Sequence, residues 1–157
     1  MAIISTVPRR SVNLPADSIF TLIGSALGGR LIDGPEQGAF LSELAAWLGV
    51  PHVFGASSGR SAFQLALEAL DLNQGSEIIF PVFTFPVMPM VAKRLGYRPV
   101  FCDVDPHTLN AGPEHFAARI NERTGAMLAT HLFGQPCPIR ELTTLARDKD
   151  IRLMEDC

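Results

Sequence analysis

The alternation of short apolar runs with helical segments constrains the fold more than any other feature of this chain. The runs "EIIFP", "RPVFCDV", "AMLATHLF" and "IRLMED" have the length and composition of buried strands. Segments with helical periodicity, such as "VMPMVAKRLG" and "IRELTTLARDK", separate them. Parallel strands need such crossover connections, and helices then cover both faces of the sheet. The pattern therefore predicts an α/β fold with a mainly parallel sheet flanked by helices.

The predicted elements divide the chain from residue 52 onward. We expect strands at residues 52–56, 77–81, 98–104, 126–133 and 151–156, and helices at residues 61–70, 87–96, 113–120 and 139–149. An earlier segment, "DGPEQGAFLSELAAWLGV", predicts a further helix whose apolar face carries Phe40, Leu44, Trp47 and Leu48. We expect this helix to pack on the main body.

Charge and composition exclude several classes of protein. The 157 residues are long enough for one domain, and the formal charge of −3 with scattered lysines and arginines leaves no basic surface for nucleic acid. No segment is long and apolar enough to cross a bilayer, and the N-terminus lacks the pattern of a secretory signal. The three cysteines lack C-x-x-C spacing and the four histidines lack zinc spacing, so we expect reduced thiols, no metal and a cytoplasmic protein.

The stretch "VFGASSGRSAFQLALEAL" is typical of an anion site. An apolar run leads through a Gly/Ser turn into a helix, whose first N–H groups and dipole attract a phosphate. A dinucleotide site is one interpretation, because "GASSG" resembles the opening of short-chain dehydrogenases. That pattern needs a third glycine where this chain has Ser61, and an acidic residue after the second strand, where none follows Phe80 directly.

A cofactor with one phosphate and a flat, basic ring is the other interpretation. It needs a helix N-terminus for the phosphate, an aromatic side chain for the ring, and a carboxylate to keep the ring nitrogen protonated. Gly59 opens a helix, Phe83 and Phe85 follow one strand, and Asp156 ends another. Ligands of parallel sheets bind at the carboxyl ends of the strands, where all of these residues fall.

Several motifs together resemble one family. "SSGRSAFQLALEAL", "EIIFPVFTFPV", "YRPVFCDVDPHTLN", "HLFGQP" and "MEDC" are similar, in order and spacing, to motifs of the DegT/DnrJ/EryC1/StrS family. "GPEQGAFLSELAAWLGV" resembles the lead-in of that family. The resemblance implies an aminotransferase dependent on pyridoxal 5′-phosphate (PLP), with the PLP fold-type-I large domain, a homodimeric assembly and a nucleotide-linked keto-sugar as substrate.

The resemblance also assigns roles to individual residues. It implies that Gly59, Arg60 and Ser61 form the backbone cradle for the cofactor phosphate, that Phe85 stacks on the ring, and that Asp156 pairs with the pyridine nitrogen. The family usually has threonine at the position of Arg60, so a hydroxyl is replaced here by a guanidinium that can bind phosphate itself. His131 follows a strand and is either part of the pocket or structural, and "DVDPHTLN" predicts a turn.

The Schiff-base lysine of the family lies downstream of the Glu-Asp motif, beyond Cys157. Lys93 and Lys149 are predicted to be on helix surfaces, so no residue of this chain is expected to be that lysine. Residues 1–157 are therefore expected to be the N-terminal portion of the large domain, without the small C-terminal domain. On its own the chain is expected to be inactive and to bind PLP weakly.

Three functions follow from these expectations. The first is part of an aminotransferase that moves an amino group from glutamate or glutamine to a keto-sugar nucleotide. The second is a sugar dehydratase of the same family, in which histidine replaces the lysine. The third is a non-catalytic remnant that binds a partner or regulates.

Overall fold

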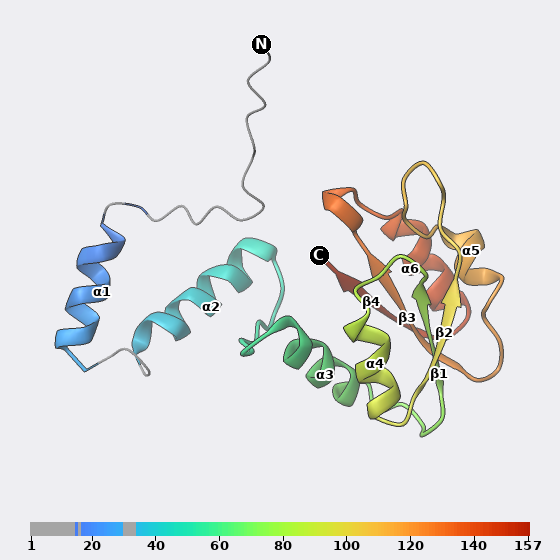
Figure 1. Cartoon of the computed structure of the whole chain (residues 1–157), viewed down its shortest axis with the longest axis horizontal. Helices are drawn as coiled ribbons and strands as arrows, with labels where there is room; N and C mark the ends of the chain where they lie inside the picture. Colours follow the sequence, from blue (N-terminus) through green and yellow to red (C-terminus); the bar gives the residue numbers. More distant parts are fainter. Residues whose placement is uncertain (1–14, 16, 30–33) are drawn as a thin grey trace, which may run out of the picture. The chain divides into compact units, whose positions relative to one another are not determined.

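The computed structural model describes residues 15, 17–29 and 34–157, which divide between two compact units, Met1–Gly55 and Ala56–Cys157. In the first unit lie α1 (Ser18–Leu27) and α2 (Pro35–Leu48) (Figure 1). The helix predicted in "DGPEQGAFLSELAAWLGV" is confirmed as α2, with proline at its first position and Gly49 as a left-handed C-cap. Phe40, Trp47 and Leu48 are exposed, and their packing on the main body stays a prediction. None of the helices seen in these ranges has the length and hydropathy needed to cross a membrane.

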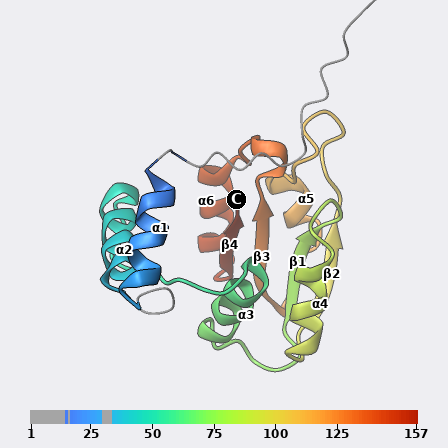
Figure 2. The same cartoon turned by 60° about the vertical axis from the view of Figure 1, so that its left-hand side comes forward.

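The second unit contains a four-stranded sheet, and all of its paired strands are parallel. Figure 2 shows the strands side by side in the order β2-β1-β3-β4. The elements of this unit are α3 (Gly59–Ala69), β1 (Glu77–Pro81), α4 (Val87–Arg94), β2 (Arg98–Cys102), α5 (Pro113–Ala117), β3 (Thr124–Thr130), the 3₁₀ turn η1 (Leu132–Gly134), α6 (Ile139–Asp148) and β4 (Arg152–Asp156). The predicted α/β fold with a parallel sheet is confirmed.

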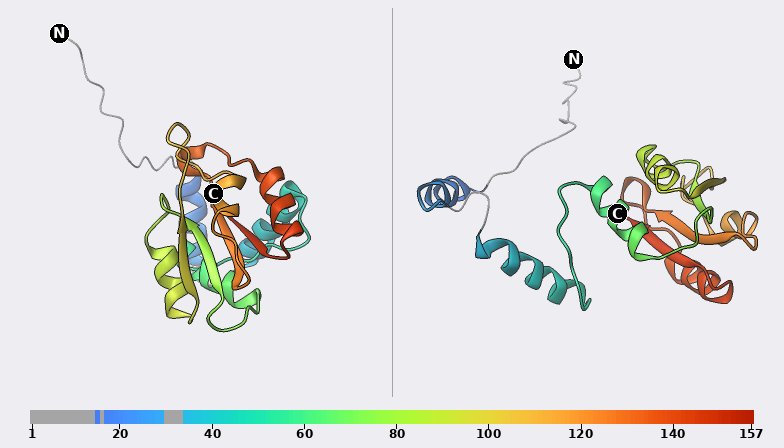
Figure 3. Two further views of the ribbon diagram at one scale, coloured as in Figure 1. Left: turned by 90° about the vertical axis from the view of Figure 1, so that its right-hand side faces the viewer. Right: turned by 90° about the horizontal axis from the view of Figure 1, so that it is seen from below.

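Helices cover both faces of the sheet, which gives the three layers visible in Figure 3. On one face, Phe63 and Leu67 of α3 and Val91 of α4 pack against apolar side chains of β1 and β3. On the other face, Phe116 of α5 and Leu142 of α6 do the same. Strands β1 and β3 are buried almost throughout, which explains their nearly continuous apolar sequences.

One predicted strand is absent and several predicted elements end earlier than expected: the strand predicted at residues 98–104 ends at Cys102, and the helix predicted at residues 113–120 ends at Ala117. Residues 52–56 do not form a strand: a strand needs a hydrogen-bonded neighbour, and no segment of the described chain pairs with them. The strand predicted at residues 126–133 ends at Thr130, and residues 132–134 form η1, because the backbone N–H of Leu132 bonds to the side chain of Asn110 instead of to a neighbouring strand. The turn predicted in "DVDPHTLN" is confirmed by the bonds from the N–H groups of His107 and Thr108 to the Asp105 carboxylate.

A buried carboxylate ties the amino ends of the strands together. Glu77, the first residue of β1, is 5% exposed and accepts hydrogen bonds from Asn121 Nδ2 at 2.8 Å and Arg123 Nε at 2.7 Å. These hydrogen bonds, that of Asn121 first, lower the pKa of Glu77 against the opposing effect of burial. Because Asn121 and Arg123 precede β3, the cluster links the starts of two central strands.

We expect Glu77→Gln to lower the free energy of unfolding by about 1–2 kcal/mol at pH 7, because the hydrogen bonds from Asn121 and Arg123 lose their buried, charged acceptor. The pKa of Glu77 is lower in the folded chain than in the unfolded chain, so its contribution is present above the unfolded pKa. The contribution is lost as the pH falls through the folded pKa. Urea denaturation of both proteins between pH 3 and 7 should show the two curves converging in acid, and a constant difference would contradict this role.

Candidate functional site

Three adjoining cavities lie at the carboxyl ends of the strands in the second unit. The first, of about 380 Å³, is lined by Gly59, Met88 and Asp156 among others. The second, of about 350 Å³, includes Phe85 and Asp156, and the third, of about 240 Å³, includes Gly59, Arg60 and Phe85. Each cavity shares residues with the next, so the start of α3, the segment after β1 and the end of β4 meet in one place.

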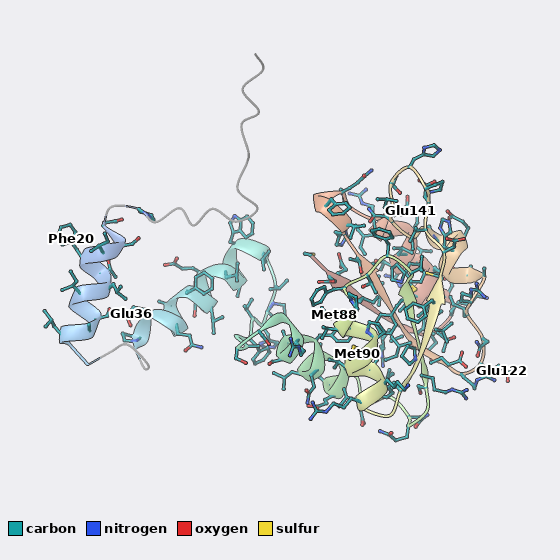
Figure 4. All side chains as sticks on the ribbon, in the orientation of Figure 1. Phe20, Glu36, Met88, Met90, Glu122 and Glu141 are labelled. Carbon is teal, nitrogen blue, oxygen red and sulfur yellow. The ribbon has the colours of Figure 1, made fainter. Side chains whose placement is uncertain are left out.

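Met88 contributes to two of these cavities from α4. It is buried, whereas Met90, two residues further along the same helix, is 67% exposed; both are labelled in Figure 4. The apolar face of α4 thus forms part of the floor of the site, while its other face is turned to solvent. The site therefore rests on the same layer of side chains that holds α4 to the sheet.

The start of α3 provides an anion site. Ser58 is the N-cap, and its Oγ accepts a hydrogen bond from the Ser61 N–H at 3.2 Å. Helix geometry leaves the N–H groups of Gly59 and Arg60 without an acceptor inside the helix. A Cβ added at Gly59 would meet no protein atom within 4 Å, so it would project into open space beside these N–H groups. Space and donors for a phosphate are thus both present.

Serine hydroxyls surround the same helix start. Ser61 Oγ lies 3.1 Å from Ser57 Oγ and 3.0 Å from Ser58 Oγ. These hydroxyls add rotatable donors to the fixed backbone donors. Because the Ser61 N–H already bonds to Ser58, the hydroxyl is the group of Ser61 that remains to serve an anion, which sequence reasoning did not indicate; Ser61 is not among the residues that line the three cavities.

Aromatic side chains line the segment that follows β1. Phe83 is 48% exposed and Phe85 is 61% exposed, and both line the cavity that contains Asp156. Aromatic side chains of a protein core are normally buried, whereas these two rings are exposed and line one cavity. They therefore offer a surface for a flat ligand. Thr84, between them, is anchored to the sheet because its Oγ1 lies 3.2 Å from Thr130 Oγ1 at the end of β3.

Asp156 ends β4 and is half-buried. It pairs with Thr130 in the parallel ladder, and its carbonyl oxygen accepts the His131 N–H at 2.9 Å. Burial raises the pKa of the Asp156 carboxyl, and the nearby His131 opposes this effect. A carboxylate that has lost part of its solvation binds a cationic partner more strongly, and a protonated ring nitrogen is such a partner.

His131 is held in one orientation by both of its ring nitrogens. Nδ1 accepts the Cys137 N–H at 3.0 Å, and Nε2 lies 3.1 Å from Glu155 Oε2. Because Nδ1 accepts a hydrogen bond, the proton of the neutral ring is on Nε2 and points to Glu155. The sequence left the role of His131 open; the structure places it in the cavity beside Asp156, with Glu155 as its partner.

The amino ends of the strands also border a cavity, of about 480 Å³, which includes Arg123 and Arg152. Ligand sites of parallel sheets lie at the other edge, so this cavity is not the candidate. The only two lysines of the chain also lie at the amino-end edge of the sheet. Lys93 is in the last turn of α4 and Lys149 caps the end of α6, and both are exposed. Across residues 15, 17–29 and 34–157, no group of three His, Cys, Asp or Glu residues is arranged to hold a metal ion.

Comparison with known proteins finds aminotransferases among the relatives of this chain. The chain is 37% identical over 142 residues to a UDP-N-acetyl-3-dehydro-alpha-D-glucosamine 3-aminotransferase of Acidithiobacillus ferrooxidans, covering 90% of this chain and 38% of that protein. It is 37% identical over 132 residues to an L-glutamine:2-deoxy-scyllo-inosose aminotransferase of Streptomyces lividus, covering 80% and 31%.

Solved structures extend the comparison to the fold. The structure of NtdA from Bacillus subtilis with bound cofactor PMP matches with a TM-score of 0.82 and 28% identity, over 88% of this chain and 32% of that chain. The sheet and its helices are those of fold-type-I aminotransferases. The chain spans about a third of the length of the curated relatives it matches. Residues 16–157 match a PLP-dependent family, and the chain belongs to that family, the DegT/DnrJ/EryC1/StrS aminotransferase family.

Proposed function

We propose that this chain forms the cofactor-binding part of a PLP-dependent sugar aminotransferase. The observation that supports this most is the meeting of three unlike groups in adjoining cavities: a helix start with free N–H groups at Gly59, an exposed ring at Phe85 and a carboxylate at Asp156. These are the three groups that a phosphorylated pyridine needs. When bound, the cofactor supplies an electron sink for breaking a C–H bond of the substrate.

Each residue has a distinct task in this proposal. The N–H groups of Gly59 and Arg60 and the hydroxyl of Ser61 bind the phosphate at the positive end of α3. Phe85 orients the ring by stacking. Asp156 keeps the ring nitrogen protonated, and its half-buried position strengthens that interaction because water screens it less.

The substrates and the assembly are part of the same proposal. The relatives named above act, by their names, on a keto-sugar nucleotide and on a keto-cyclitol with glutamine, which supports transfer from glutamate or glutamine to a nucleotide-linked keto-sugar. Exposed apolar residues of α1, such as Ile19, Phe20 and Leu22, support a homodimer. The free thiols of Cys102, Cys137 and Cys157 support a cytoplasmic location.

Asp156→Asn tests the pairing with the ring. In the enzyme it should leave the fold intact but reduce transamination by several powers of ten, each worth about 1.4 kcal/mol of barrier. Binding of pyridoxamine 5′-phosphate to the unmodified chain should weaken as the pH falls through the raised pKa of Asp156, because the protonated carboxyl no longer pairs with the ring. The asparagine variant should lack this step, and near-normal turnover would remove the assigned role.

Gly59→Val tests the phosphate cradle. The added Cβ meets no protein atom within 4 Å, so folding should be little affected, but the branched side chain would crowd the helix start and weaken binding of pyridoxamine 5′-phosphate at least tenfold. Arg60→Thr is the matched control: Arg60 is exposed, and threonine is usual in the family, so we expect little change. Equal affinity of the two variants in a calorimetric titration would argue against the cradle.

The covalent lysine is proposed to come from a part of the enzyme outside residues 1–157. Lys93 and Lys149 end helices that run antiparallel to the strands, so they lie at the edge of the sheet opposite Asp156. Incubation of this chain with PLP, reduction with borohydride and mass spectrometry should therefore show no stoichiometric adduct on either lysine. Specific labelling of one of them, with turnover of an amino sugar, would contradict the proposal.

A further inference from the structure

The turn η1 holds an aromatic residue in an unfavourable backbone conformation. Phe133 has φ 53° and ψ 27°, in the left-handed region that bulky residues avoid. Its ring is 84% exposed, so burial of the ring does not compensate for the strain. Strain of this kind persists only where the surroundings impose it, and it often marks functional sites.

Asn110 imposes the conformation of this turn. Its side chain is buried, and both of its polar groups bond to backbone on either side of Phe133: Oδ1 accepts the Leu132 N–H at 3.1 Å, and Nδ2 donates to the Gln135 carbonyl at 2.7 Å. Asn110 itself is fixed, since its carbonyl accepts the Asp105 N–H at 3.0 Å. A loop that follows β2 thus clamps a turn that follows β3.

The clamped turn borders the candidate site. Phe133 lines the cavity of about 350 Å³ that also contains Phe85 and Asp156. Phe85 is assigned to the cofactor ring under the proposed function. Of the other two phenylalanines that line this cavity, Phe83 is 48% exposed and Phe133 is 84% exposed, so Phe133 offers the more accessible ring to a group attached to the cofactor. Sugar rings carry faces of C–H groups that pack on aromatic rings, and aromatic residues commonly line pockets for such ligands.

We propose that Phe133 is a specificity-determining residue, a second aromatic wall that contacts the six-membered ring of the substrate, and that Asn110 is the positioning residue that holds it there. This inference rests on the proposed function. It predicts that a residue that tolerates the left-handed conformation at position 133 makes the chain more stable but weakens its contact with the ligand.

The first measurement is thermal denaturation of the chain. Phe133→Asn should raise the midpoint by roughly 3 °C, because asparagine tolerates the left-handed conformation and little packing is lost. Asp150→Gly is the matched control: Asp150 is exposed, has φ 51° and lies at the other end of the sheet, so its midpoint should rise slightly without any change in binding. Asn110→Ala should lower the midpoint, because two buried backbone groups lose their partner.

The second measurement is binding to the same chain by ligand-observed NMR, which detects weak complexes. The probes are pyridoxamine 5′-phosphate and its N-cyclohexyl derivative, whose added ring has the size of a sugar. Phe133→Asn should reduce the preference for the derivative about fivefold, as expected for the loss of one apolar contact of about 1 kcal/mol. Asn110→Ala should reduce the preference for the derivative by a similar factor, although it lowers the denaturation midpoint whereas Phe133→Asn raises it.

The outcomes separate the inference from the proposed function. Failure of the unmodified chain to bind either probe would overturn both. Binding of pyridoxamine 5′-phosphate with the same preference in the unmodified chain and in Phe133→Asn would overturn only the inference. A lower midpoint for Phe133→Asn would also overturn it, because the ring would then be a stabilising part of the fold.

Discussion

Parallel pairing of β1, β3 and β4 is the constraint on which the rest of this structure depends. Parallel strands end at the same edge, so every segment that leaves a strand begins in the same place. Residues that are far apart in the sequence, such as Phe85, His131 and Asp156, therefore line the same cavity although each follows or ends a different strand. The helices on both faces make this pairing stable by burying β1 and β3 on both sides.

Buried polar side chains supply the specific positions that apolar packing cannot. Glu77 links the starts of β1 and β3, and Asn110 links the loops that follow β2 and β3. Each is almost fully buried and bonded, which is the condition under which a buried polar group is tolerated. Glu77 lies at the amino ends of the strands, where its hydrogen bonds stabilise the sheet. Asn110 lies at the carboxyl ends, where its hydrogen bonds fix the geometry of the candidate site.

The candidate site has positive potential at one end and negative charge at the other. The start of α3 offers positive potential from its N–H groups, while Asp156 and Glu155 place negative charge at the end of β4. A ligand with a phosphate at one end and a cationic ring nitrogen at the other matches both. His131, fixed between Cys137 and Glu155, holds Glu155 beside this arrangement and so keeps the second carboxylate in a defined place.

The sequence by itself predicted the α/β class, every strand of the sheet, and four residues, Gly59, Arg60, Phe85 and Asp156, that line the adjoining cavities. It did so because periodicity and turn residues are local properties, and because strand ends are where a parallel sheet places its ligands. The sequence could not determine that residues 52–56 lack a strand partner or that Leu132 leaves its strand, because pairing depends on distant neighbours. Only the tertiary structure decided that Glu155 is the partner of His131 and that Asn110 clamps the turn of Phe133. These contacts join residues up to 25 positions apart, and no local pattern encodes them.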